Sequence, residues 1–165
     1  MEEVNLDKLT NEATDLIRQG EPKKALALLK PHLKTIGAQH AGAWRIAGGA
    51  MARMDLDDHA IAALEHATKI DDSVASGWYN LGSLYARNDN DRGAKEAFET
   101  TIELDPRHVK ARRKMIAYAK ENDDIGSLLS HGMILLENQD DAELRDEIVQ
   151  KLLSCGEAEV KVLEY

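Results

Sequence analysis

A pattern that recurs after 34 residues constrains this chain more than any other feature of its sequence. The matched residues are Trp44 and Trp78, Gly48 and Gly82, Ala60 and Ala94, and Leu64 and Phe98. A fixed interval of this length is typical of chains in which one small structural unit stacks on the next. We therefore expect an array that buries its apolar surface between neighbouring units.

The copy at residues 75–108 indicates what the unit is. Its first apolar stripe has the helical spacing i, i+3, i+4 and i+7 and consists of Trp78, Leu81, Gly82 and Tyr85. A second stripe with helical spacing consists of Ala94, Phe98, Thr101 and Ile102. The segment 88–91 between them is Asn-Asp-Asn-Asp, which favours a turn, and Pro106 ends the second helix. The unit is thus predicted to be an antiparallel helix pair, which Gly82 and Ala94 allow to pack closely.

The rest of the chain divides at nearly the same interval. Residues 41–74 carry the pattern one period earlier. The connection that precedes this pair, residues 34–40, is one residue longer than the repeat interval requires. Residues 5–40 and 109–141 keep helical periodicity but lose most of the signature, as outer repeats do. Residues 142–165 predict a final helix and a tail.

Local signals refine these boundaries. Pro22 can start a helix, whereas Pro31 should kink or shorten the same helix because it lacks a backbone donor. Gly156 is expected to end the final helix. The expected apolar face of that helix consists of Leu144, Ile148, Leu152 and Cys155, widened by Val149 and Leu153.

The spacing W-x2-L-G-x2-Y, then A-x3-F, then P, resembles the tetratricopeptide repeat. The resemblance implies an all-α fold, a right-handed superhelix of tandem antiparallel helix pairs with a C-terminal capping helix, forming one domain over residues 1–165. It also implies a non-catalytic adaptor whose concave groove, lined by the first helix of each pair, holds a peptide or helix of a partner protein.

Carrying the groove positions of that family onto this sequence assigns twelve partner-binding residues. They are Arg45, Gly49, Arg53, Ser76, Tyr79, Asn80, Ser83, Arg87, Lys110, Arg113, Lys114 and Ala117. Six of these twelve residues are basic and none is acidic, and the remaining groove positions of the three repeats add only Lys120 and Glu121 as charged residues. Such a stripe would attract an acidic or C-terminal segment of a partner. A solvated helix face could show the same bias, so this alternative stays open.

Some members of the family hold the C-terminal carboxylate of heat-shock chaperones in a clamp of Lys, Asn, Asn, Lys and Arg. The corresponding positions here are Arg45, Gly49, Asn80, Lys110 and Lys114. Gly49 replaces an asparagine, and Arg and Lys are exchanged at two positions, where they are not equivalent as bidentate donors. This chain therefore departs from the clamp.

Composition narrows the function classes. A net charge of −9 argues against a general nucleic-acid binder. The single Cys155 permits no internal disulfide, and the acidic start MEEVNLDKLT resembles neither a signal nor a transit peptide, so we expect a cytoplasmic protein without membrane insertion. Two further hypotheses are a self-associating scaffold and a secretion-type chaperone, which should have a more apolar groove.

No residue set indicates an enzyme, a cofactor or a metal site. Asn88, Asn90, Gly93 and Glu99 resemble a calcium loop, but Arg92 occupies a ligand position, which favours an inter-helix turn. His59 and His66 lack a third ligand and are interpreted as surface residues. Cys155 is interpreted as a small buried hydrophobe, and the two tryptophans as core residues.

Overall fold

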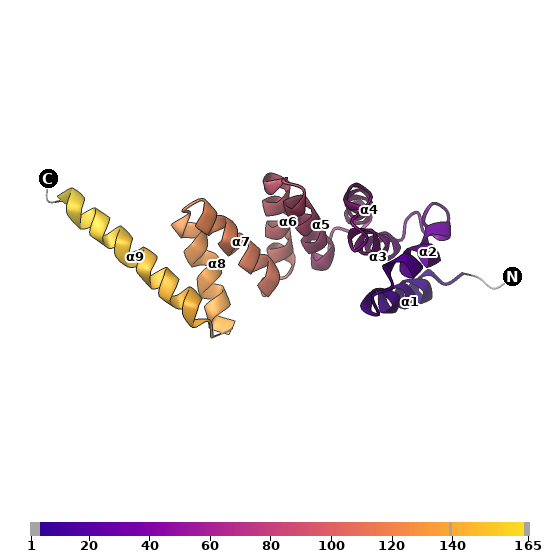
Figure 1. The fold of residues 1–165 in the computed structure, drawn as a ribbon, viewed down its shortest axis with the longest axis horizontal. Helices are drawn as coiled ribbons and strands as arrows, with labels where there is room; N and C mark the ends of the chain where they lie inside the picture. The colour runs from indigo at the N-terminus through magenta and orange to yellow at the C-terminus, as the bar shows by residue number, and fades with distance from the viewer. Residues whose placement is uncertain (1–3, 139, 164–165) are drawn as a thin grey trace. The chain divides into compact units, whose positions relative to one another are not determined.

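The computed structural model describes residues 4–138 and 140–163, and every regular element in this part of the chain is an α-helix. The chain divides into two compact units, Met1–Leu104 and Asp105–Tyr165. Their helices are labelled in Figure 1. The first unit contains α1 (Leu6–Arg18), α2 (Pro22–Leu33), α3 (Ala41–Ala52), α4 (Asp57–Ile70), α5 (Ala75–Arg87) and α6 (Asp91–Leu104). The second contains α7 (Val109–Glu121), α8 (Ile125–Asn138) and α9 (Ala142–Leu163). The assignment of residues 1–165 to one domain stays a prediction.

The helices form the pairs that the sequence predicts, so the fold is an all-α solenoid of helix pairs. α1 packs on α2, α3 on α4 and α5 on α6, while α3 and α5 each also pack on the second helix of the preceding pair. Pro22 is the first residue of α2, and Pro31 lies near its end, which comes two residues later at Leu33. His40 and His108 cap α3 and α7, because each Nδ1 accepts a backbone N–H three residues ahead, at 3.0 and 3.1 Å.

One turn geometry joins the two helices of every pair. A residue with left-handed backbone conformation occupies the same place in each turn: Gly20 (φ 80°), Asp55 (56°), Asp89 (58°) and Asp123 (54°). The following backbone N–H donates to the carbonyl five residues earlier, at 2.8, 3.0, 2.9 and 2.8 Å along the chain. This is the Schellman ending of an α-helix. The turns are 35, 34 and 34 residues apart, which confirms the repeat register and the extra residue in the 34–40 connection.

Small residues let the helices of a pair approach closely. A Cβ on Gly48 would lie 2.9 Å from Cγ of Leu64, and a Cβ on Gly82 would lie 2.9 Å from Cε1 of Phe98. Leu64 and Phe98 are fully buried, as are Ala60 and Ala94 beside them. The large residue on each second helix therefore fills the space that glycine leaves on the first.

The two tryptophans are only partly buried, which corrects their interpretation as core residues. Each lies at the edge of the core, and the Nε1–H of Trp78 donates to the carbonyl of Asp72 at 2.8 Å. Arg112 holds the corresponding place in the fourth repeat and makes the same bond, from Nε to the carbonyl of Pro106, at 2.8 Å. Although charged, Arg112 is only 5% exposed. A guanidinium can therefore replace the indole because both present an N–H to the same carbonyl.

Trp44 differs from Trp78 because its Nε1 is buried without a described hydrogen-bond partner. The carbonyl of Ala38, six residues earlier, instead lies 3.2 Å from Nε2 of His66. The ring of His66 stands edge-on to Trp44, with centroids 4.7 Å apart. His66 is thus a partly buried packing residue, which corrects its interpretation as a surface histidine.

The second unit exchanges the sizes of the two packing residues. Ile116 stands where the earlier repeats have glycine, and Gly132 stands where they have leucine or phenylalanine. A Cβ on Gly132 would lie 2.6 Å from Cδ1 of Ile148, which belongs to α9. Ile148 and Leu144 are buried in the core of this unit, so α9 covers α8 as a capping helix.

The final helix differs from its prediction in two ways. α9 continues through Gly156 to Leu163, so the expected end at Gly156 was wrong. Val149, Leu152 and Leu153 are 46%, 47% and 57% exposed, because α9 has 22 residues against 14 in α8 and packs extensively on that helix alone among the described helices. The side chain of Cys155 lies outside the described residues.

Candidate functional site

A cavity of about 610 Å³ opens in the first unit between the first helices of three consecutive pairs. Its lining comes from α1, α3 and α5, from Arg53 directly after α3, and from Leu64 of α4. Seven of the predicted groove residues line it: Arg45, Gly49, Arg53, Ser76, Asn80, Ser83 and Arg87. The structure therefore brings together most of the positions that the repeat pattern assigns to this unit.

One predicted residue of this unit lies elsewhere, and one helix contributes residues that the prediction lacked. Tyr79 does not line the cavity, and its ring packs against Phe98 with centroids 5.8 Å apart. Thr14, Ile17 and Arg18 of α1 complete the cavity wall. A shift of 35 residues, which allows for the extra residue in the 34–40 connection, would have aligned Arg18 with Arg53.

The cavity combines cations with an apolar floor. Its charged lining residues are Arg18, Arg45, Arg53 and Arg87, and no Asp or Glu lines it within the described part of the chain. Leu64 and Leu84 are buried at its base, and Ile17 and Ile46 are half-buried. Such a surface can bind carboxylates through the guanidinium groups and an apolar side chain against the floor.

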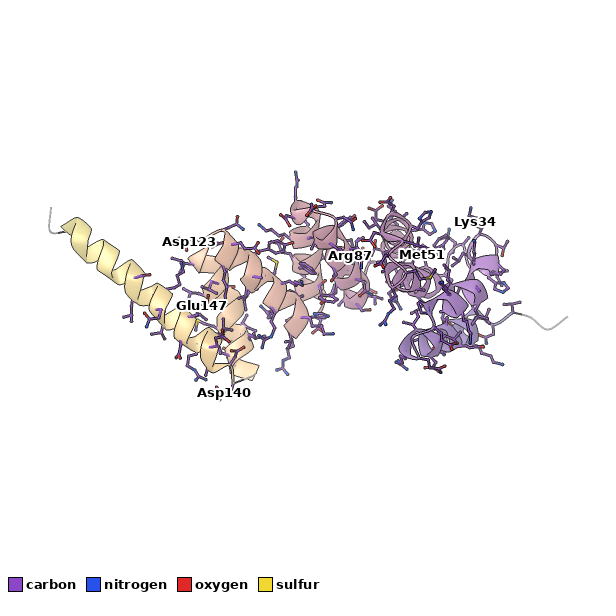
Figure 2. All side chains as sticks on the ribbon, viewed as in Figure 1. Lys34, Met51, Arg87, Asp123, Asp140 and Glu147 are labelled. Atoms are coloured by element: carbon purple, nitrogen blue, oxygen red, sulfur yellow. The ribbon has the colours of Figure 1, made fainter. Side chains whose placement is uncertain are left out.

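Arg87 is held by the preceding repeat rather than offered to a ligand. Its Nε donates to Oδ2 of Asp57 at 2.6 Å, and its Nη2 donates to the other carboxylate oxygen and to the carbonyl of Ala52. Arg87 is labelled in Figure 2. Oδ1 of Asp55 lies 3.8 Å from Nη1 of Arg87, and Nδ2 of Asn88 donates to Oδ2 of Asp57 at 2.9 Å. The hydrogen bond from Arg87 is the main cause that lowers the pKa of Asp57. This Arg87 cluster was not foreseen from the sequence, because its acids belong to another repeat.

The other three arginines of the cavity differ in their partners. Arg18 pairs with Asp15 of its own helix at 3.1 Å, where both side chains are exposed. Arg45 packs along α5, where a Cβ on Gly77 would lie 3.7 Å from Cδ of Arg45. The pKa of Asp71 is lowered mainly by a hydrogen bond from Ser73, and the charge of Arg45 adds to this lowering. Arg53 is exposed and makes no ion pair or hydrogen bond with any described side chain.

The predicted groove residues of the fourth repeat belong to the second unit. Arg113 and Ala117 line a smaller cavity of about 220 Å³ between α7 and α9. There Arg113 donates to Asp141 at 2.9 Å, and Lys120 pairs with Glu147, which is labelled in Figure 2. Lys110 and Lys114 are exposed and do not line this cavity. Acids at the start of α9 thus neutralise part of the predicted basic stripe.

The segment that resembles a calcium loop forms the turn between α5 and α6. Asn88 donates to the carbonyl of Leu84 at 2.8 Å, and Oδ1 of Asn90 accepts the N–H of Gly93 at 3.1 Å. These side chains therefore end one helix and cap the next.

Within the described residues, no helix is both long and apolar enough to cross a membrane.

Comparison with known proteins connects this architecture to other chains. Residues 75–108 match the sequence profile of the family described as Tetratricopeptide repeat. The search of curated protein sequences found no match. The crystal structure of MamA is similar, with 27% sequence identity and a TM-score of 0.61 over 98% of this chain and 82% of that one.

Two further solved structures share the fold at lower identity. YrrB, described as a TPR protein with an unusual peptide-binding site, has 18% identity and a TM-score of 0.71 over 88% of this chain and 84% of its own. PilF of Pseudomonas aeruginosa has 15% identity and a TM-score of 0.73 over 89% of this chain and 67% of its own.

Proposed function

Because this chain is built from tetratricopeptide repeats, we propose that it is a non-catalytic adaptor that binds an acidic or C-terminal segment of a partner protein in the cavity of its first unit. One observation carries the choice of partner. Four arginines line the cavity, and two of them, Arg45 and Arg53, make no ion pair with a described residue, while the whole chain has a net charge of −9 and no described acid joins the lining. The cavity is thus a basic site on an acidic protein, which attracts a negatively charged segment by its local field.

The chemistry of the lining fits a peptide in further ways. The amide of Asn80 can both donate to and accept from a peptide backbone, and Ser76 and Ser83 add hydroxyl groups on the same helix. Leu64 and Leu84 give an apolar residue of the peptide a floor to pack against. The solved structure of YrrB, with a described peptide-binding site on the same fold, supports this use of the architecture. We place this function in the cytoplasm, since the single Cys155 leaves no internal disulfide to form.

The experiment compares partner capture by three forms of the full chain from a lysate of the native source. The cavity variant is Arg45→Ala/Asn80→Ala, and the matched control is Lys23→Ala/Arg107→Ala, which removes two exposed cations outside the predicted groove. We expect the wild type and the control to capture the same protein and the cavity variant to lose it, with circular dichroism showing that all three are folded. An acidic segment cut from that protein should then compete for binding. Equal capture by all three forms would refute the proposal.

A second candidate function is self-association, which the exposed face of α9 favours. Val149, Leu152 and Leu153 lie at helical spacing on one side of α9, and each is about half exposed. In an array of helix pairs, such a face packs against a further helix, and here a second copy of the chain could provide it. Sedimentation of the wild type should show a mass that rises with concentration, whereas Leu152→Lys/Leu153→Lys should stay monomeric. A wild type that is monomeric throughout would exclude this candidate.

A further inference from the structure

Three arginines occupy the same position in three consecutive repeats. Arg18, Arg53 and Arg87 each precede the left-handed turn residue by two positions, and all three line the cavity. Arg87 reaches back to two acids of the preceding repeat, Asp55 and Asp57. One of these is the left-handed turn residue of that repeat, and the other is the first residue of its second helix.

The repeat before Arg53 lacks both acids. The two corresponding positions, which precede Asp55 and Asp57 by 35 residues, are Gly20 and Pro22. Neither side chain has an oxygen that could accept a hydrogen bond from a guanidinium. This explains why Arg53 has no ion pair with a described residue although Arg87 has two.

The backbone around the two positions is equivalent. Gly20 and Asp55 have φ values of 80° and 56°, and the hydrogen bond that closes the turn measures 2.8 Å in the first pair and 3.0 Å in the second. Pro22 begins α2 as Asp57 begins α4. α3 packs on α2 as α5 packs on α4. The two sites therefore differ in their side chains and not in their backbone geometry.

From this comparison we propose that Arg53 is the specificity-determining residue of the cavity, and that a carboxylate of the partner binds beside it as Asp57 binds beside Arg87. This inference rests on the proposed function and deepens it, because it assigns the carboxylate to one of four arginines. The carboxylate can come from an Asp or Glu side chain or from a C-terminus, since both present the same two oxygens to a guanidinium. Arg87 then positions α5 against α4 rather than binding the partner.

The test adds an intramolecular acid instead of only removing the arginine. Pro22→Asp supplies the carboxylate that Arg53 lacks, at the first position of α2, where an acid also favours the helix dipole. Pro22→Ala is its matched control, Arg53→Gln removes the proposed contact directly, and Arg107→Gln removes one exposed cation of the second unit that is not a predicted groove residue. The probe is a fluorescent hexaglutamate peptide with an amidated C-terminus, followed by anisotropy. Hexaglutamine with a free or an amidated C-terminus separates the two sources of carboxylate.

We expect Pro22→Asp and Arg53→Gln to weaken hexaglutamate binding by about three- to fivefold, as for one ion pair near the surface, and the two controls to bind within about twofold of the wild type. Stronger binding of free than of amidated hexaglutamine, lost in Pro22→Asp, would assign the site to a C-terminal carboxylate. If the wild type prefers hexaglutamate to hexaglutamine but both variants bind as it does, the assignment to Arg53 is overturned and the proposed function stands. A wild type without any preference overturns both. If Pro22→Asp does not fold, Arg53→Gln decides alone.

Discussion

Two adjacent glycines of α3 allow the close packing of the helix pair to be measured directly. A Cβ on Gly48 would lie 2.9 Å from Cγ of Leu64, 3.1 Å from its Cδ2 and 3.3 Å from the carbonyl oxygen of Ala60. A Cβ on Gly49 would have no heavy atom within 4 Å. Both residues lie inside the same helix, so an alanine at either position gains the same helix propensity.

The magnitudes separate the two effects. Replacing glycine by alanine inside a helix stabilises it by about 1 kcal/mol. Forcing an extra carbon into a packed core costs about 1–3 kcal/mol. We therefore expect Gly49→Ala to raise the free energy of unfolding by up to about 1 kcal/mol. Gly48→Ala should lower that free energy by up to about 2 kcal/mol once the propensity gain is subtracted. The difference between the variants is the packing cost alone.

The assay is urea unfolding followed by far-ultraviolet circular dichroism, with thermal unfolding as a second reading. A difference of 1 kcal/mol corresponds to roughly 2–4 °C in the melting temperature of a chain of this size. Gly49→Ala should unfold at a higher urea concentration than the wild type, and Gly48→Ala at a lower one. If Gly48→Ala unfolds at the same urea concentration as Gly49→Ala, or at a higher one, close approach of α3 and α4 is not what requires glycine there.

Three further predictions concern a turn, a hydrogen bond and the cap. Asp89→Gly should stabilise the chain by up to about 1 kcal/mol and Asp89→Val should destabilise it by a similar amount in urea unfolding, because only glycine adopts positive φ without strain. Burial and the 2.6 Å hydrogen bond to Glu65 raise the pKa of Tyr85 to about 12. The unfolded chain then loses this proton near pH 10 and the folded chain does not, so stability should fall as the pH rises from about 10 to 12, and Tyr85→Phe should lack that loss. Gly132→Ala should destabilise the wild type more than it destabilises Ile148→Val, which lacks the Cδ1 atom that the new Cβ would meet, and a double-mutant cycle of urea midpoints checks this.

The helix pairs could be predicted from the sequence because their signals are local. The stripe from Trp78 to Tyr85 has helical spacing, and Pro22 and the 88–91 turn mark helix boundaries within a few residues of where they occur. Recurrence at a fixed interval then extends one well-marked pair to its weaker neighbours. The same register assigns both Arg45 and Asn80 to the predicted groove, and both line the cavity of the first unit.

The parts that could not be predicted depend on contacts between repeats. The predicted basic stripe includes Arg87 and Arg113, but Arg87 pairs with Asp57 of α4 and Arg113 with Asp141 directly before α9, and no local sequence signal connects these partners. The predicted end of the final helix at Gly156 was wrong for a different reason. Glycine lowers helix propensity without forbidding a helix, and α9 continues through Gly156.

The exchanged sizes of Ile116 and Gly132 limit which parts of this protein can be moved to another array. The second and third repeats use the same small and large positions, so each could replace the other, or be duplicated, with its internal fit preserved. The fourth repeat cannot be transplanted alone, because the space above Gly132 is filled by Ile148 of α9. When this array is lengthened or shortened, α7, α8 and α9 should therefore be kept together as one unit, and repeats should be added or removed before residue 109.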